Sequence, residues 1–226
     1  MFRKFARPLL VGTSLALGAL AAQAAQLAVT AYDMPNGDGT AHSGSWNYWD
    51  ANYTGSGATT TDGLSGSTLS GGTGKLTDGH IATSPWYLVS NNAGTGDYVG
   101  WEGPSVAKIT FHFASAVDIG EIKLYVDNSH VGGVYAPDMV TVDGTTFANA
   151  AWASASNPEV IDLTGLAVHG SSVDVTLHNF SGSFGSWVFL SEAEFFGASA
   201  VPEPGNLAMM LGGLPLFAFL ARRRRG

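Results

Sequence analysis

Alternation of apolar and polar residues is the clearest pattern in the centre of the chain. Ile109, Phe111 and Phe113 are each separated by one polar residue. A period of two places every second side chain on the same face of a strand, so this pattern predicts a half-buried β-strand. The same period, or a short apolar run bounded by turn residues, recurs at 27–31, 122–126, 139–142, 160–163, 173–177 and 187–196.

The connections between these strands predict an all-β fold. No segment between residues 25 and 200 keeps a helical period, and Asp143-Gly144 is a favourable tight turn. The stretch from Gly37 to Gly74 is rich in Gly, Ser and Thr and predicts long surface loops with tight turns. Many short strands joined in this way are typical of an antiparallel β-sandwich, and we expect a jelly roll of two packed sheets.

The N-terminus has the pattern of a secretory signal peptide. Arg3, Lys4 and Arg7 give a basic start, and an apolar stretch over 8–20 follows. Ala22-Gln23-Ala24 then supplies small residues around a cleavage point. We expect residues 1–24 to be removed on export; the alternative is a retained N-terminal anchor.

The C-terminus has a second pattern of this kind. The apolar residues 205–221 would form a helix of ~25 Å, enough to cross a thin bilayer. The arginines that follow would stay on the cytoplasmic side. A helix buried in a globular domain is the alternative, and it fits the arginines and prolines badly. The residues that flank the apolar run are Val201, Pro202, Glu203 and Pro204 before it and Arg222, Arg223, Arg224 and Arg225 after it.

This order of short motif, single hydrophobic helix and basic cluster resembles the PEP-CTERM sorting tail of exported Gram-negative proteins. The resemblance implies recognition by an exosortase-type sorting enzyme and transient anchoring in the membrane. The final location would be the cell surface or the extracellular matrix. The chain then divides into a signal peptide (1–24), a body (25–200) and a sorting tail (201–226), in which 201–204 is the motif, 205–221 the transmembrane segment and 222–225 the basic cluster.

The charge of the body excludes one class of partner. Its only basic side chains are Lys75, Lys108 and Lys123, against seventeen acidic ones (the eighteen of the whole chain less Glu203). The body therefore carries a net charge of −14, although the whole chain carries −8. Nucleic acid is excluded as a partner, because phosphates need basic residues. Such a negative charge would favour the binding of divalent cations, or it would serve only to keep an exported domain soluble, and both interpretations stay open.

Two segments are candidates for a cation site. Residues 76–86 have the form L-x-D-G-x-x-x-T-x-x-W, in which an acid at a turn is followed by a hydroxyl, and Ca²⁺ prefers such oxygen donors. Glu192 shares the parity of Val188 and Leu190, and a buried carboxylate is costly unless it is neutralised. Either a cation compensates Glu192 or this face becomes exposed at the strand end. The chain has no cysteine, which excludes disulfides, thiolate metal sites and a cysteine nucleophile.

Together Asp78–Trp86, Trp187–Glu192 and Val134–Gly144 resemble the discoidin family, also called galactose-binding-like or coagulation-factor C-type domains. The resemblance covers about residues 27–197 and implies a structural calcium that pins the early loop to the last strand. The implied ligands are the carboxylates of Asp78 and Glu192, the hydroxyl or carbonyl of Thr83, and the main-chain carbonyls of Leu76 and His80.

The resemblance also implies ligand binding, often of sugars, by loops at one end of the sandwich. An aromatic platform and a few polar groups would hold the sugar. We expect Trp86 and Trp187 to belong to the core. The candidate ligand-binding residues are Trp46, Tyr48, Trp49, Trp101, His130 and Trp152.

No catalytic motif is found. The histidines do not form an HExxH pair, and no G-x-S-x-G segment occurs. We therefore expect an exported, non-catalytic module that binds carbohydrate or exopolysaccharide. The alternative is a structural component of the matrix or envelope with no discrete ligand.

Overall fold

The computed structural model describes residues 24–39, 46–60, 67–103, 106–179 and 186–199. Within them no helix is long and apolar enough to cross a membrane. The predicted signal peptide, except for Ala24, and the predicted sorting tail lie outside these residues. The strands are β1 Ala25–Leu27, β2 Val29–Pro35, β3 Thr68–Gly72, β4 Val99–Glu102, β5 Val106–Asn128, β6 Met139–Val142, β7 Thr145–Ala148, β8 Ser156–His178 and β9 Trp187–Ser199; the short helices are η2 Lys75–Thr77, α2 Trp86–Val89 and η3 Ala150–Ala153.

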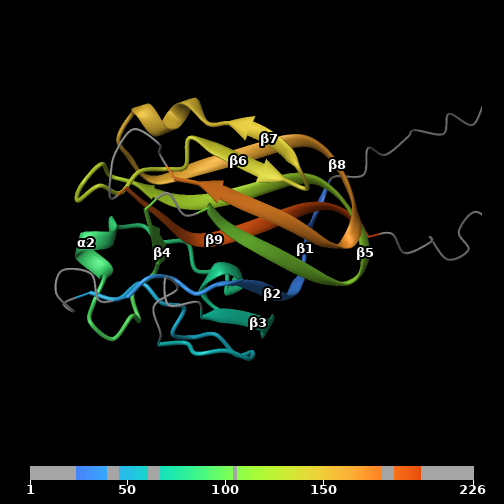
Figure 1. Cartoon of the computed structure of the whole chain (residues 1–226). Helices are drawn as coiled ribbons and strands as arrows, with labels where there is room; N and C mark the ends of the chain where they lie inside the picture. The colour runs from blue at the N-terminus through green and yellow to red at the C-terminus, as the bar shows by residue number, and fades with distance from the viewer. Residues whose placement is uncertain (1–23, 40–45, 61–66, 104–105, 180–185, 200–226) are drawn as a thin grey trace, which may run out of the picture.

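Two long strands, β5 and β8, hold the fold together. They pair antiparallel along most of their length, and each bends partway. Residues 106–113 of β5 lie between β2 and the end of β8, whereas residues 117–126 lie between β9 and the start of β8. Both strands therefore pass from one layer to the other, and the prediction of an all-β antiparallel sandwich is confirmed (Figure 1).

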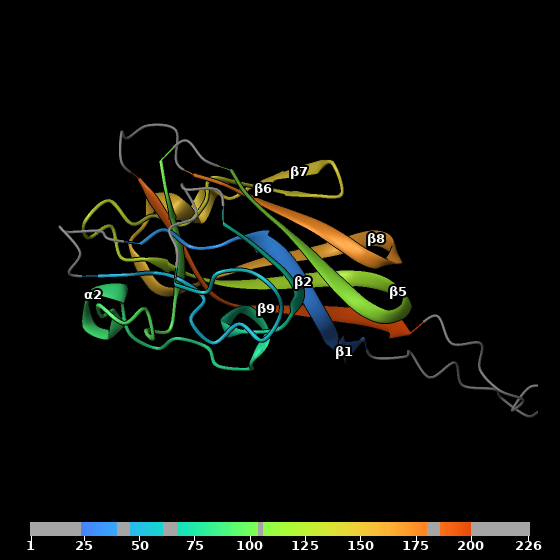
Figure 2. The same cartoon turned by 60° about the horizontal axis from the view of Figure 1, so that its bottom comes forward.

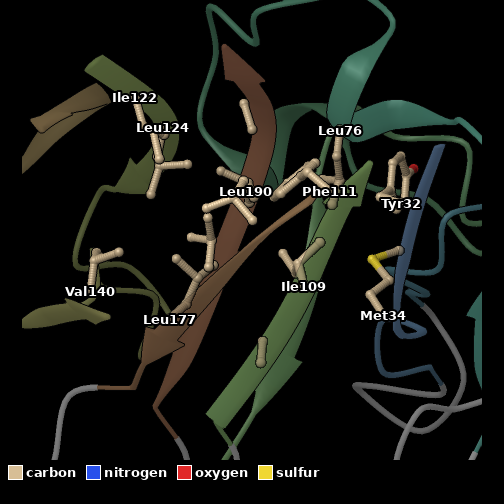
Figure 3. Close-up of a cluster of buried hydrophobic side chains, with 14 of the residues drawn as sticks. Tyr32, Met34, Leu76, Ile109, Phe111, Ile122, Leu124, Val140, Leu177 and Leu190 are labelled. Carbon is tan, nitrogen blue, oxygen red and sulfur yellow. The ribbon is translucent and has the colours of Figure 1, made fainter. Parts of the chain in front are cut away.

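The alternating positions fill one core between the layers. Phe111 of β5 meets Phe195 of β9 with ring centroids 4.8 Å apart. Figure 3 shows Ile109, Leu177 and Leu190 pointing into the same space, and all three are fully buried. Burial of apolar surface on this scale is the main source of stability for a chain without disulfides.

A second, aromatic cluster lies at the end of the sandwich that carries α2. There Trp86 and Trp187 are 3% and 9% exposed, which confirms their predicted place in the core. We call this the loop end, because α2, the segment that follows β5 and the start of β9 meet there. The opposite end, where β5 and β8 bend and β1 pairs with the end of β9, is the terminus end (Figures 1 and 2).

The described residues between Gly37 and Gly74 confirm the prediction of surface loops only in part, since residues 54–58 are exposed. The region also contains β3, and several of its polar side chains are buried. Asn36 shows how this is possible: its Oδ1 accepts the amides of Gly37 at 2.8 Å and Asp50 at 3.0 Å. Polar loops can be buried when internal hydrogen bonds replace water. The predicted turn at Asp143-Gly144 is confirmed, with φ of 43° and 83° between β6 and β7.

Candidate functional site

The turn after η2 brings two predicted cation ligands together. Gly79, with φ of +81°, redirects the chain so that its amide donates to Oε2 of Glu192 at 3.2 Å. Glu192 lies on β9, against which η2 packs, and is only 3% exposed. The strand pattern left the exposure of Glu192 open, and the structure shows that it is buried. The predicted parity with Val188 and Leu190 is wrong, because a β-bulge separates them: Leu190 pairs with Val126, whereas Glu192 pairs with Tyr125 on the opposite face.

The surroundings of Glu192 disfavour its charged form. Burial raises its pKa to about 8, and the neighbouring Asp78 carboxylate adds to the increase. Hydrogen bonds from the amides of Gly79 and Asp78 oppose the increase without cancelling it. The ion pairs found among the described residues do not include Glu192. A buried carboxylate in this setting either stays protonated or needs an external cation.

The other predicted calcium ligands, Leu76, His80 and Thr83, differ in burial and in the partners of their side chains. The side chain of Leu76 is fully buried, so only its carbonyl could bind a cation. The His80 amide donates to Oδ1 of Asp78 at 2.8 Å, while its exposed ring lies 3.5 Å from Asp97. Thr83 is exposed. The described residues contain no group of three or more His, Cys, Asp or Glu side chains that could hold a metal, so a cation here would depend on hydroxyl and main-chain oxygens as well.

Sequence reasoning missed Thr77. Its hydroxyl oxygen is buried and has no hydrogen-bond partner among the described residues. Thr77 and Glu192 both line a hollow of about 280 Å³ between β1, β2 and β9. An orphaned hydroxyl beside an uncompensated carboxylate fits a hard cation such as Ca²⁺.

The other side of η2 carries a network that the sequence did not predict either. The Lys75 ammonium donates to the carbonyls of Trp49 at 2.7 Å and Gly94 at 2.5 Å. The Lys75 amide donates to Oδ1 of Asp50 at 3.2 Å, and the Tyr32 hydroxyl donates to Oδ2 of the same carboxylate. Burial lowers the pKa of Lys75 to about 8, although nearby acids, Asp50 first, oppose the decrease. Lys75 therefore joins the loop that carries Trp49 to the segment that precedes Asp78.

Trp86 organises the aromatic residues of the loop end. Its ring meets that of Trp46 edge-on at 5.0 Å and that of Tyr87 at 5.8 Å, and its Nε1 donates to the Val131 carbonyl at 3.0 Å. Tyr87 is 42% exposed and Leu88 68%. The loop end thus offers aromatic and apolar surface that a rigid ring supports.

The predicted ligand-binding residues divide into groups. Tyr48 and Trp101 are 2% and 3% exposed, so the structure corrects their assignment as a platform. Tyr48 packs against Trp187 and Phe189, and Nε1 of Trp101 donates to the Pro35 carbonyl at 2.9 Å.

The remaining candidates have partial exposure or lie outside the description. Trp46 and Trp49 are half-buried. His130, with φ of +60°, packs against Tyr135 at 4.7 Å and is also half-buried. The side chain of Trp152 is outside the described residues. Trp46 and Tyr87 both contact Trp86. Sequence reasoning missed Tyr87 because it lies next to a core tryptophan.

The histidine pairs do not form a catalytic triad. His112 pairs with Asp33 at 2.9 Å and His169 with Asp118 at 2.6 Å, both on partly exposed surfaces. His178 instead lies 2.8 Å from the Thr141 hydroxyl. Because the carboxylate-bound and hydroxyl-bound histidines are different residues, these pairs do not provide the relay that a triad requires.

Comparison with known proteins identifies the family. Residues 28–196 match the family described as Discoidin domain-containing receptor 1/2, DS-like domain. The chain belongs to this discoidin-like family. No curated protein matches the chain.

The discoidin-like chain is also similar to solved structures at low identity. One is the C-terminal domain of a chitobiase from Bacteroides fragilis, with 12% identity over 78% of this chain and 100% of that one and a TM-score of 0.41. Another is chitosan-binding module 1 of a chitosanase/glucanase from Paenibacillus sp. IK-5, with 18% identity over 54% and 83% and a TM-score of 0.34. A third is the lectin domain of lectinolysin complexed with Lewis B antigen, with 14% identity over 55% and 83% and a TM-score of 0.38.

Proposed function

We propose that this discoidin-like protein is an exported, non-catalytic module that binds carbohydrate at its loop end. The observation that supports this most is the arrangement around Trp86, which supports the partly exposed rings of Trp46 and Tyr87. The apolar face of a sugar stacks on such rings, while a few polar groups fix its orientation. His130, whose Nε2 lies 3.1 Å from Oδ1 of Asn128, is our candidate for that second role, and it precedes Val131, whose carbonyl accepts Nε1 of Trp86.

Charge narrows the class of glycan. The body has a net charge of −14 and contains no arginine, so a polyanionic polysaccharide would be repelled. Neutral glycans and those with free amino groups are compatible with such a surface. We therefore expect a neutral or amino-sugar polymer of the extracellular matrix.

A glycan array tests this proposal with the full chain in detergent. We expect saturable binding to a neutral or amino-sugar glycan, weakened about tenfold or more by Tyr87→Ala and by Trp46→Ala. Phe196→Ala is the matched control, because this partly buried aromatic residue lies near the terminus end, beside Lys123. Uniform silence would favour the alternative of a structural matrix or envelope component, and turnover of a glycan would favour an enzyme.

We also propose that a structural calcium binds between η2 and β9. Asp78, Glu192 and Thr77 would hold it, with main-chain carbonyls of the same turn such as those of Leu76 and His80. The hydroxyl or carbonyl oxygen of Thr83 is a further candidate ligand of this calcium. A bound Ca²⁺ would neutralise the two carboxylates and so hold the turn against the last strand.

Calorimetric titration with calcium tests this site. We expect one site per chain and a higher Tm with calcium than with EDTA. Glu192→Gln should abolish both effects, whereas Glu121→Gln should preserve them, because Glu121 lies outside the hollow and pairs with Lys123 at 2.9 Å. Equal calcium responses in the two variants would rule the site out.

Finally, we propose that residues 1–24 direct export and that residues 201–226 anchor the protein until an exosortase-type enzyme processes it. The final location would be the cell surface or matrix. Mass spectrometry of the protein from cell fractions tests both termini. Finding the intact chain soluble in the cytoplasm, with both ends untrimmed, would contradict this.

A further inference from the structure

Both ends of the described domain lie at the terminus end. β1 pairs with the end of β9, with Ala25 opposite Gly197. The chain therefore enters and leaves the domain at adjacent points, far from α2 (Figures 1 and 2). Any membrane attachment through either end would act on this side of the sandwich.

The distance available to such an attachment is short. β9 ends at Ser199 and the apolar run begins at Gly205, so residues 200–204 are all that separates them. Five residues span at most about 18 Å even when fully extended. A tail in the bilayer would hold the terminus end close to the lipid headgroups.

The surface of the terminus end is unusual for this protein. Residues 113–117, where β5 bends, contain no titratable side chain, and residues 164–172 of β8 contain only His169. Nδ1 of His169 lies 2.6 Å from Oδ1 of Asp118, so these two polar groups pair with each other. In a body with a net charge of −14, this end therefore carries few charges, with Asp118 as the acid beside these segments.

The same end has a mostly apolar hollow of about 410 Å³. Ile119, Leu166, Val168 and Ala198 line it, together with the paired Asp118 and His169; Ala24 also lines it until the signal peptide is removed. A surface with few charges reduces repulsion by anionic lipids, and apolar side chains gain free energy in the interfacial layer.

We propose that the terminus end is a membrane-contacting surface, with the hollow around Leu166 and Val168 resting on the lipid interface while the tail is inserted. This inference rests on the proposed insertion of residues 205–221. The loop end with Trp46 and Tyr87 then points away from the membrane. The anchored protein would thereby present its glycan-binding end to the surrounding matrix.

Single-cysteine labelling tests this orientation, because the chain has no cysteine of its own. The full chain is reconstituted in vesicles of phosphatidylcholine and phosphatidylglycerol that contain nitroxide-labelled lipids. A fluorophore is placed through Ser115→Cys at the bend of β5, Leu88→Cys at the loop end, or Gly213→Cys in the apolar run. We expect headgroup nitroxides to quench the label at 115 at least threefold more than the label at 88. Acyl-chain nitroxides should quench the label at 213.

Different outcomes would contradict the orientation, the insertion of the tail and the lipid contact of the hollow. Deep quenching at 213 with equal quenching at 115 and 88 would overturn the orientation and leave the sorting tail intact. Absence of quenching at 213 would overturn tail insertion, and the orientation with it. Leu166→Asp combined with Val168→Asp should at least halve quenching at 115; unchanged quenching would show that the hollow does not contact lipid. A dimer in detergent that these two substitutions dissociate would assign the hollow to a second copy and overturn the proposal.

Discussion

Two buried carboxylates on either side of η2 show how different the outcome of burial can be. Asp50 is fully buried and Glu192 is 3% exposed, and burial raises the pKa of both. Asp50 nevertheless sits in a complete network, since the Tyr32 hydroxyl and the Lys75 amide donate to its two oxygens. Gly74 leaves room for this network, because a Cβ there would lie 2.5 Å from Oδ2 of Asp50.

Glu192 differs in the charges that face it. Main-chain amides of the turn donate to it as well, but the charged groups that raise its pKa are carboxylates, Asp78 first, whereas the Lys75 ammonium faces Asp50. A satisfied buried acid is a structural element, whereas one that faces a second acid is destabilising until a cation arrives. Asp50 therefore stabilises the fold, whereas Glu192 is the acid that could bind a cation.

Removal of Asp50 should have the largest effect. Asp50→Ala leaves the Tyr32 hydroxyl and the Lys75 amide without acceptors inside the core, and we expect it to lower the free energy of unfolding by about 3–5 kcal/mol. Urea unfolding measures this loss. Asp33→Ala is the control, because Asp33 lies partly exposed beside His112 and should cost less than about 1 kcal/mol. Similar losses of unfolding free energy in both variants would mean that the buried hydrogen bonds of Asp50 stabilise the fold no more than a surface pair does.

Removal of the Lys75 ammonium should come next. Lys75→Met leaves the carbonyls of Trp49 and Gly94 without their donor, and we expect a loss of about 2–3 kcal/mol. Hydrogen exchange should accelerate at residues 46–50 and 91–97, which these bonds hold. Lys123→Met is the matched control, since Lys123 forms a partly exposed pair with Glu121 at 2.9 Å. Unchanged hydrogen exchange at residues 46–50 and 91–97 in Lys75→Met would contradict the role of this lysine in holding the two loops.

The pH dependence of Glu192 should be smaller and of a defined sign. Its folded pKa of about 8 lies above the ordinary value of 4.5, so the folded state binds more protons between these values. Without calcium, stability is therefore fully present below about pH 4.5 and is lost as pH rises towards 8. The full shift would correspond to about 5 kcal/mol, and solvent screening at the open hollow lowers the expected change to about 2–3 kcal/mol. We expect Glu192→Gln to remove this slope, measured by urea unfolding in EDTA at several pH values.

Calcium should act in the opposite direction on the same residue. Because it binds the ionised form, its stabilising effect on the native protein should grow from pH 5 to pH 8. Asp50 and Asp127 also have pKa values raised by burial, so a residual slope should persist in Glu192→Gln. If the slope of the variant equals that of the native protein in EDTA, Glu192 titrates alike in the folded and unfolded states, and the comparison with Asp50 fails.

Much of the sandwich could be predicted because strands have a short period. Ile109, Phe111 and Phe113 alternate with polar residues, and all three are buried in β5 as that pattern requires. The pattern did not show that 109–113 and 122–126 belong to one bent strand. That continuity depends on pairing with β8, which is distant in sequence.

The site was less predictable for the same reason. Asp78 was identified from a turn motif and Glu192 from its parity with Val188 and Leu190. The bulge after Leu190 breaks that parity, but Glu192 is buried and its pKa responds to Asp78. Thr77 and Lys75 were missed, because burial of a hydroxyl or an ammonium depends on loops that are not periodic. Tyr48 and Trp101 were misassigned, since an aromatic residue in a glycine-rich or turn-rich segment has no local feature that separates core from surface.

A surface ion pair should give the smallest effect and so calibrate the comparison. Nζ of Lys108 lies 2.7 Å from Oδ2 of Asp174, with the two side chains 59% and 38% exposed. Hydrogen bonds from Lys108 and Thr110 lower the pKa of Asp174, so its contribution is present above pH 4 and is lost at lower pH. We expect Lys108→Ala to cost about 0.5 kcal/mol in urea unfolding at low salt and nothing measurable in 1 M salt. A salt-independent cost as large as that of Asp50→Ala would show that pairing, and not burial, decides what an acid contributes in this protein.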